Sequence, residues 1–116
     1  EKGPLLETYV LHELRSAIAY LNIGGEISYW RTPAGVEIDF IWSRGSTAVA
    51  LEVKSATQWR REYSSALHGA LEQKLVRHAC GIYLGRNALR EGNLHIYPIG
   101  EFLKQLWSGE ILTTGK

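Results

Sequence analysis

The protein has 116 residues, of which 45% are apolar and 22% are charged, and its net charge is +1. This length holds one domain with a single core, and the composition is that of an ordinary globular protein. No apolar run approaches the roughly 20 residues of a membrane-spanning helix, so no membrane partner is expected. A single cysteine, Cys80, excludes an internal disulfide and favours a cytoplasmic location. Because the chain contains no methionine, we expect it to be part of a longer protein.

The hydrophobic pattern of the first half predicts one helix and three strands. A helix is expected over 4–21, where apolar residues recur at helical spacing after a proline suited to a first turn. Strands are expected over 26–31, 36–42 and 47–54. Because turns of about four residues separate them, an antiparallel meander is favoured.

The second half alternates helix and strand. The pattern predicts a helix over 58–77, a buried strand over 81–85, a loop over 87–93, an edge strand over 94–98, a helix over 99–107 and a C-terminal tail over 108–116. The resulting order, α-β-β-β-α-β-β-α, indicates one α/β domain over 1–107. Its expected architecture is a central mixed β-sheet flanked by helices.

Charge is unevenly distributed along the chain. Residues 1–53 carry four Lys or Arg and seven acids, whereas residues 54–90 carry seven Lys or Arg and two acids. Such a division is typical of a metal site beside a groove for a polyanion, and also of a solvated helix face rich in basic residues. If the basic segment borders a site, its candidates for nucleic-acid phosphates are Arg60, Arg61, Lys74 and Arg77. Trp59, between them, is expected to pack on the core, with base stacking as the alternative.

Asp39 is the only aspartate of the chain, and thirteen residues later an apolar strand ends in Glu52 and Lys54. Strand side chains alternate between faces, so Glu52 and Lys54 should emerge together. A charged pair on a core strand costs desolvation unless a partner offsets it, and a divalent metal shared with Asp39 would do so. The alternative is an exposed ion pair worth less than ~1 kcal/mol.

Asp39 itself lies in a strand that alternates apolar and acidic residues. Strict alternation predicts that it shares a face with Glu37 and Ile41, while Ile38, Phe40 and Trp42 fill the opposite face. The alternative is an edge strand whose acids face water.

A third carboxylate is expected from the first helix. Glu7 falls between Leu14 and Ile18 within the apolar arc, and Glu13 also falls inside that arc. Acids rarely occupy a buried face without a partner. They could lie at the rim or pair with arginines, namely Arg15 or Arg31. The alternative is that one of them faces Asp39 and Glu52, and of the two we favour Glu7.

Four short motifs occur in a fixed order: LETYV at 6–10 followed by Glu13 and Leu14, YWRT at 29–32, GVEIDF at 35–40 and LEVKS at 51–55. Together they resemble the PD-(D/E)XK nuclease superfamily, which has the fold of restriction endonucleases and archaeal Holliday-junction resolvases. They look most like the nuclease-like C-terminal module that follows a P-loop ATPase domain in many bacterial and archaeal proteins. The later GIYLG at 81–85 fits the same pattern, and the resemblance spans residues 3–107.

This resemblance implies an endodeoxyribonuclease that hydrolyses DNA phosphodiester bonds with Mg²⁺ or Mn²⁺. Asp39, Glu52 and the backbone carbonyl of Val53 would bind the metal. Lys54 would orient or activate the attacking water, and Glu7 would complete the acidic cluster. The chemistry is consistent, because Mg²⁺ prefers carboxylate and water ligands and lowers the pKa of bound water.

The expected partners are DNA and the N-terminal ATPase domain of a parent protein. No Walker A motif occurs, so this chain should not hydrolyse ATP. Two alternatives stay open, because fold alone does not fix function. One is a non-catalytic DNA- or protein-binding module with an idle acidic site. The other is a regulatory or dimerisation domain that forms a homodimer through Leu103, Leu106 and Trp107.

Overall fold

The computed structural model describes residues 2–113 and, within them, the side chains from Gly3 onward. Over this range the chain forms three α-helices, one short 3-10 helix and six strands. In chain order they are α1 (Lys2–Leu21), β1 (Glu26–Arg31), β2 (Glu37–Arg44), β3 (Thr47–Val53), η1 (Arg61–Ser64), α2 (Ser65–Glu72), β4 (His78–Tyr83), β5 (Leu89–Glu91), β6 (Leu94–Pro98) and α3 (Ile99–Trp107).

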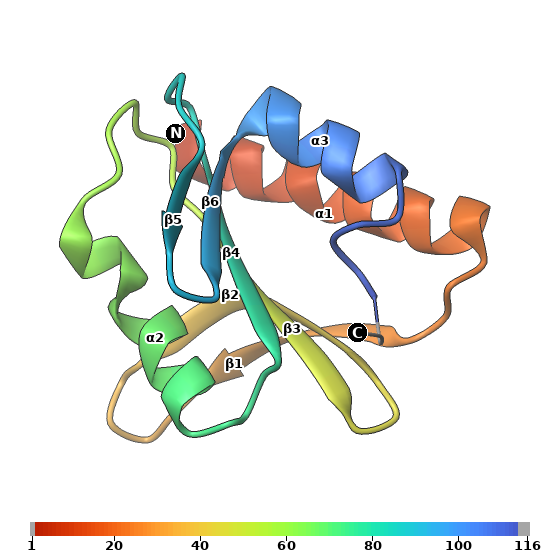
Figure 1. Cartoon of the computed structure of the whole chain (residues 1–116), viewed down its shortest axis with the longest axis horizontal. Coiled ribbons are helices and arrows are strands. Elements are labelled where there is room, and N and C mark those ends of the chain that lie inside the picture. The colour runs from red at the N-terminus through yellow and green to blue at the C-terminus, as the bar shows by residue number, and fades with distance from the viewer. Residues whose placement is uncertain (1, 114–116) are drawn as a thin grey trace.

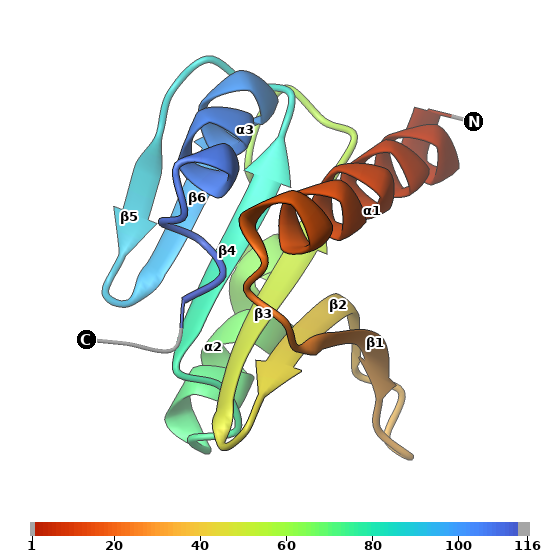
Figure 2. The same cartoon turned by 90° about the vertical axis from the view of Figure 1, so that its right-hand side faces the viewer.

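The strands form one mixed sheet in the order β1-β2-β3-β4-β6-β5. The first three strands are an antiparallel meander, β3, β4 and β6 are parallel, and β5 is antiparallel to β6. Helices α1 and α3 lie side by side against one face of the sheet, and α2 covers the other face (Figures 1 and 2). The predicted α/β domain with a mixed sheet between helices is therefore confirmed.

Two apolar clusters, one on each face of the sheet, make up the core. On the α2 face, Leu67 and Ala70 of α2 pack with Ile38, Ala50, Ala79, Leu94 and Ile96. On the other face, α1 and α3 cover Trp42, Val49, Leu51, Cys80 and Ile82 with the side chains Val10, Leu14, Ala17, Phe102 and Leu106. Burying each large apolar side chain stabilises the fold by about 1.5–3 kcal/mol. Burial also raises the pKa of the Cys80 thiol to about 12, as expected of an unreactive structural cysteine.

The helix predicted over 58–77 is shorter, and it comprises only η1 and α2. Arg60 is extended (φ −97°, ψ 149°), so the helical turn cannot begin earlier. At the other end Lys74 takes a left-handed conformation (φ 60°), and the Leu75 N–H donates to the Ala70 carbonyl at 2.9 Å. This pattern is a Schellman termination on a non-glycine residue, which the sequence did not signal.

Two further predictions need correction. The segment predicted as a loop over 87–93 contains strand β5, which forms a hairpin with β6 through a two-residue turn led by Gly92 (φ 63°). The strand predicted over 81–85 is β4, which begins earlier, at His78, because that residue pairs with Val49 of β3.

Within the segment expected as a tail, 108–116, two residues pack in the core. Ile111 and Leu112 are buried in the cluster that α1 and α3 cover. The last three residues of that segment, 114–116, lie outside the described residues. No helix within residues 2–113 combines the length and apolarity needed to cross a bilayer.

Candidate active site

Strand β2 carries a β-bulge at Asp39 and Phe40. The register between β1 and β2 shifts between Ser28 and Trp30, so that one residue of β1 lies opposite these two residues of β2. A bulge of this kind re-aims the side chains of the bulged strand. Here it turns Asp39 toward α1, where its side chain lines a cavity of about 400 Å³ together with Glu7.

The bulge also overturns the face assignment made from strict alternation. Ile38 and Ile41 pack on the α2 face, whereas Phe40 and Trp42 pack on the α1 face. The expectation that Ile38, Phe40 and Trp42 share one face is wrong, because the extra residue shifts the alternation by one position.

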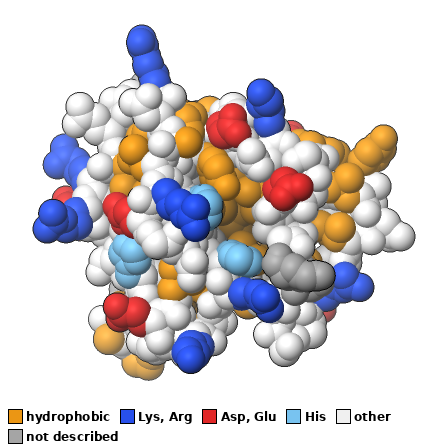
Figure 3. All heavy atoms as spheres, viewed as in Figure 1, with side chains coloured by type: hydrophobic (Ala, Val, Ile, Leu, Met, Phe, Trp, Pro, Cys, Tyr) orange, Lys and Arg blue, Asp and Glu red, His pale blue; other side chains and the backbone are white. Residues whose placement is uncertain are grey.

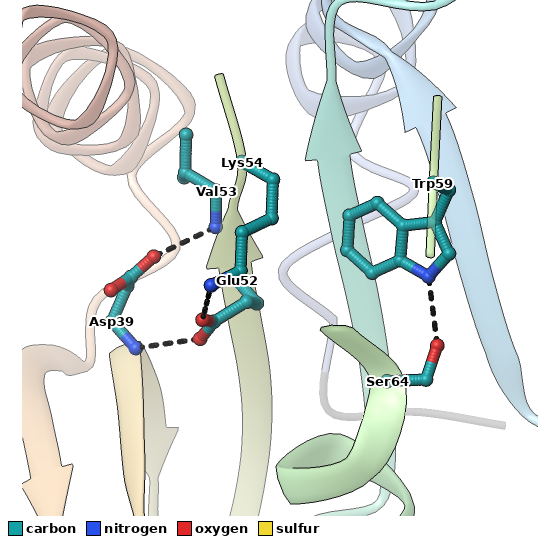
Figure 4. A network of polar contacts seen from close by, with 6 residues as sticks. All are labelled: Asp39, Glu52, Val53, Lys54, Trp59 and Ser64. Carbon is teal, nitrogen blue, oxygen red and sulfur yellow. Dashed lines mark hydrogen bonds and ion pairs between the residues drawn. The ribbon is translucent and has the colours of Figure 1, made fainter. Parts of the chain in front are cut away.

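Two side-chain–backbone hydrogen bonds close the end of the β2–β3 ladder. The Asp39 N–H donates to Glu52 Oε1 at 3.1 Å, and the Val53 N–H donates to Asp39 Oδ2 at 2.8 Å (Figure 4). Backbone pairing of the two strands stops at Phe40 and Leu51. The two carboxylates thus accept the N–H groups that a continued ladder would have used, and they are fixed side by side at the strand end.

Lys54 follows directly after β3. Its Nζ lies 3.2 Å from Glu52 Oε2 and 5.1 Å from the centre of the Tyr63 ring. Its backbone N–H donates to the Ile82 carbonyl of β4 at 2.9 Å, which holds its main chain in the plane of the sheet. The Lys54 side chain remains 35% exposed, whereas that of Glu52 is only 10% exposed, so the ammonium is the member of the pair that solvent reaches.

Glu7 is the glutamate of α1 that neighbours Asp39. The pKa of Glu7 is raised, first by burial and then by the negative charge of Asp39 and a hydrogen bond with its carboxyl, while Lys54 opposes the rise. Glu13 instead accepts a hydrogen bond from Trp107 Nε1 at 2.9 Å, which ties α1 to α3. The two glutamates of the helix therefore have different partners.

Burial raises the pKa values of the carboxyls in this cluster, and repulsion by neighbouring carboxylates adds to the rise. Burial raises the pKa of Asp39, against the lowering effects of the Val53 N–H and of Lys54. Glu52 has a pKa of about 7, raised first by burial and then by the charge of Asp39. Like charges held together in a partly buried place are typical of functional sites, and they are stabilised by an added cation.

The donor chemistry fits a hard divalent cation, because the cluster offers carboxylate oxygens. As the side chains stand, no three Asp, Glu, His or Cys residues among the described ones are placed to hold a metal ion. Asp39 Oδ2 and Glu52 Oε1 already accept backbone N–H groups, and Glu52 Oε2 contacts Lys54. Binding a cation here requires the carboxylates to reorient toward it.

The cluster opens on both faces of the sheet. Asp39 and Glu7 line the cavity on the α1 face. On the α2 face, Glu52 and Lys54 line a larger cavity of about 610 Å³, which lies between the loop joining β1 to β2 and the segment of η1 and α2. The second cavity is wide enough for a small ligand or for part of a polymer strand.

The four basic candidates fall into two pairs. Arg60 and Arg61 lie in the segment that leads into Tyr63, the residue in contact with Lys54. Lys74 and Arg77 line a pocket at the start of β3. The Arg77 N–H donates to the carbonyl of Ala48, six residues before Lys54, which is about 20 Å along a strand.

All four basic side chains are exposed. On the face of the molecule in Figure 3, Lys and Arg side chains are spread out among acidic and neutral ones and do not gather into a single patch. This face therefore offers no single basic patch to a nucleic acid.

Sequence reasoning missed the role of Tyr63. The helix expected over 58–77 included this residue without assigning it a role, and its ring contacts the Lys54 ammonium. Tyr63 lies in the short 3-10 helix η1, which begins only at Arg61. Trp59 packs against the apolar cluster on the α2 face, as expected.

The suggested interface on the last helix has less free surface than expected. Leu106 is buried in the core, and Leu103 and Trp107 are partly buried against it.

Comparison with known proteins gives a family but no function. No curated protein sequence matches this chain, and no solved structure does. A family model described as a domain of unknown function, DUF4143, matches residues 2–102. The match covers most of the chain, including α1, the β-meander and the Glu52–Lys54 strand end, and the chain belongs to the DUF4143 family.

Proposed function

We propose that this domain is a Mg²⁺-dependent nuclease that hydrolyses DNA phosphodiester bonds, as the C-terminal part of a larger P-loop ATPase. The proposal is supported by the motif order, which resembles PD-(D/E)XK nucleases of the restriction-endonuclease type. The observation that carries it is the convergence of Asp39, Glu52 and Lys54 at one strand end, with Glu7 beside them.

Each side chain has a role that follows from its surroundings. Asp39 and Glu52, with the carbonyl of Val53, would hold the cation, and Glu7 would complete the acidic cluster. A bound divalent cation supplies a water of lowered pKa and neutralises charge on the phosphate. Lys54 keeps its ammonium at the solvent-facing side of the cluster, where it can donate to the attacking water or to a phosphate oxygen.

DNA contacts are proposed for Arg60 and Arg61, because they lie in the segment that passes the site. Arginine recognises phosphate through paired N–H donors. Lys74 and Arg77 lie about 20 Å farther along the sheet, so the proposal does not depend on them.

The test is cleavage of branched and single-stranded DNA by the full-length protein with Mg²⁺ or Mn²⁺. We expect Lys54→Ala to reduce the rate by at least about 100-fold, since a group that stabilises developing charge commonly contributes that much. The matched control is Lys104→Ala, which removes an exposed lysine of α3 and should leave the rate unchanged. Equal cleavage by wild type and Lys54→Ala would remove the catalytic assignment.

A second candidate is a DNA- or protein-binding, regulatory module of the same ATPase. It is favoured by one observation: the carboxylates already bond to backbone N–H groups and to Lys54, and no three described ligands are placed to hold an ion. This candidate expects DNA retention that falls with salt and survives Asp39→Ala, with no cleavage by the wild type.

A further inference from the structure

The ammonium of Lys54 is held from two sides. Glu52 Oε2 lies 3.2 Å from Nζ, and the ring of Tyr63 lies on another side with its centre 5.1 Å away. A cation over an aromatic face is attracted by the negative face of the ring. The ring therefore adds a second attractive contact to the ion pair that holds Lys54.

The Tyr63 ring is itself supported by Trp59. The two rings meet edge to face, with centres 5.3 Å apart and an interplanar angle of 79°. The Trp59 Nε1–H donates to Ser64 Oγ at 2.8 Å, and Ser64 is 1% exposed, so this hydrogen bond is shielded from water (Figure 4). Trp59 also lies edge-on to Tyr83 of β4 at 5.9 Å.

Gly81 of β4 lies directly against the Trp59 indole. A Cβ added at Gly81 would lie 2.4 Å from Cη2 of Trp59, so no other residue fits under the indole in this position. Gly81 pairs with Glu52 in the β3–β4 ladder. The indole is thus fixed against the strand next to the one that carries the acidic end of the site.

We propose that Tyr63 is a positioning residue for Lys54, and that Trp59, seated on Gly81 and bonded to Ser64, sets the position of Tyr63. The consequence for cleavage rests on the proposed nuclease function. The positional claim stands on contacts alone and can be tested without any activity.

The first test measures the ε-methylene proton shifts of Lys54 by NMR of the labelled 116-residue chain. In the wild type we expect these signals upfield of those of the other lysines, because they lie near the face of the Tyr63 ring. Because Tyr63→Leu removes the ring current itself, the position of Lys54 in this variant is measured from NOEs between its ε-methylene protons and the γ-methylene protons of Glu52, which should weaken in Tyr63→Leu and persist in Tyr63→Phe. Tyr20→Leu is the matched control, because it removes an exposed tyrosine near the C-terminal end of α1. Unchanged Lys54–Glu52 NOEs in Tyr63→Leu would overturn the proposal.

A second variant acts at a distance from Lys54. Ser64→Ala removes the acceptor of the Trp59 indole, and it should reduce the Lys54 shift without altering any group that touches the lysine. Retention of the full wild-type shift in Ser64→Ala would overturn the supporting role of Trp59.

The third test repeats the DNA cleavage assay on these variants. We expect Tyr63→Leu to lower kcat by about 2- to 30-fold with KM unchanged, the range that corresponds to one cation–aromatic contact. Tyr63→Phe should restore the wild-type rate. An equal loss in Tyr63→Phe and Tyr63→Leu would assign the effect to the hydroxyl and contradict the proposal.

The two ideas fail in different ways. If Lys54→Ala cleaves DNA normally, the nuclease assignment fails while the NMR result still decides the positional claim. If the Lys54–Glu52 NOEs do not depend on Tyr63, the positional claim fails whatever the cleavage rates are.

Discussion

The two ends of strand β3 differ in how deeply the charged side chains around them are buried. At its C-terminal end Glu52 is 8% exposed and lies among Asp39, Glu7 and Lys54, and the pKa of each of the three carboxyls is raised by burial. At its N-terminal end the neighbouring charges, Lys74 and Arg77, are exposed to water.

The difference is between carboxyls that are buried close together and basic groups that are solvated. Exposed charges cost little to keep and contribute little to stability. Buried carboxyls that repel one another cost stability, and such costs are typically retained at functional sites. We therefore expect changes at the C-terminal end to alter cleavage and pH-dependent stability strongly, and changes at the N-terminal end to have little effect on either.

The largest expected effect is on cleavage. Asp39→Asn keeps the size of the side chain and an oxygen that can accept from the Val53 N–H, but it removes the charge. We expect the Mg²⁺-dependent rate to fall by at least about 100-fold. Arg77→Ala, at the opposite end of β3, should leave the rate unchanged. Initial cleavage rates of the two variants, measured side by side, test this prediction. Equal rates would contradict a functional difference between the two ends of β3.

The next effect is on stability, and it depends on pH. The pKa of Glu52 is about 7 in the folded chain, against 4.5 for an ordinary glutamate. The folded state therefore binds more protons, so stability falls as pH rises from about 4.5 to 7 and then levels off. Glu52→Gln does not lose stability in this way, because its amide does not titrate. It also keeps an oxygen that can accept a hydrogen bond from the Asp39 N–H.

We expect Glu52→Gln to raise the free energy of unfolding by about 1–3 kcal/mol at pH 8 and by almost nothing at pH 4.5, since one pKa unit corresponds to about 1.4 kcal/mol. Urea denaturation at both pH values measures the difference. A Gln variant less stable than the wild type at pH 8 would mean that the Glu52–Lys54 pair is a structural ion pair.

A divalent cation should remove part of the same cost. Mn²⁺ at ten times its dissociation constant stabilises the folded state by about 1.4 kcal/mol, which is several degrees of melting temperature for a domain of this size. We expect this rise at pH 8 in the wild type and not in Asp39→Asn. Thermal melts with Mn²⁺ or with a chelator provide the measurement, and identical rises in both proteins would place the cation elsewhere.

The smallest effect is expected at the other end of the sheet. Lys74 holds a left-handed conformation (φ 60°) that glycine adopts without strain. Lys74→Gly should stabilise the fold by about 0.5 kcal/mol and leave DNA cleavage unchanged. A clear loss of cleavage in Lys74→Gly would extend the functional surface to this end.

The elements that follow from local periodicity were predictable from the sequence. The first helix, the three-stranded meander and the alternation of Leu51, Glu52 and Val53 all depend on side-chain spacing, and the structure reproduces them. The order of the motifs also predicted that Asp39, Glu52 and Lys54 lie together at one strand end, and the structure places them there.

What the sequence did not predict depends on backbone geometry that spacing does not encode. The bulge at Asp39 and Phe40 is set by register against β1, and it decides which way the aspartate points. The extended backbone at Arg60 shortens the second helix, and Tyr63, in the turn that follows, contacts Lys54. The bulge arises from long-range strand pairing, so no local window of the sequence contains it.

The most direct test of the site is the location of a paramagnetic cation. Mn²⁺ added in small amounts to the ¹⁵N-labelled chain broadens the amide signals nearest to it. If a divalent cation binds between the carboxylates, the amides of Asp39, Val53 and Lys54 will broaden first, and Glu52→Gln will weaken the effect. Broadening that begins elsewhere, or that spreads evenly over exposed acids, would contradict a cation site at the end of β3.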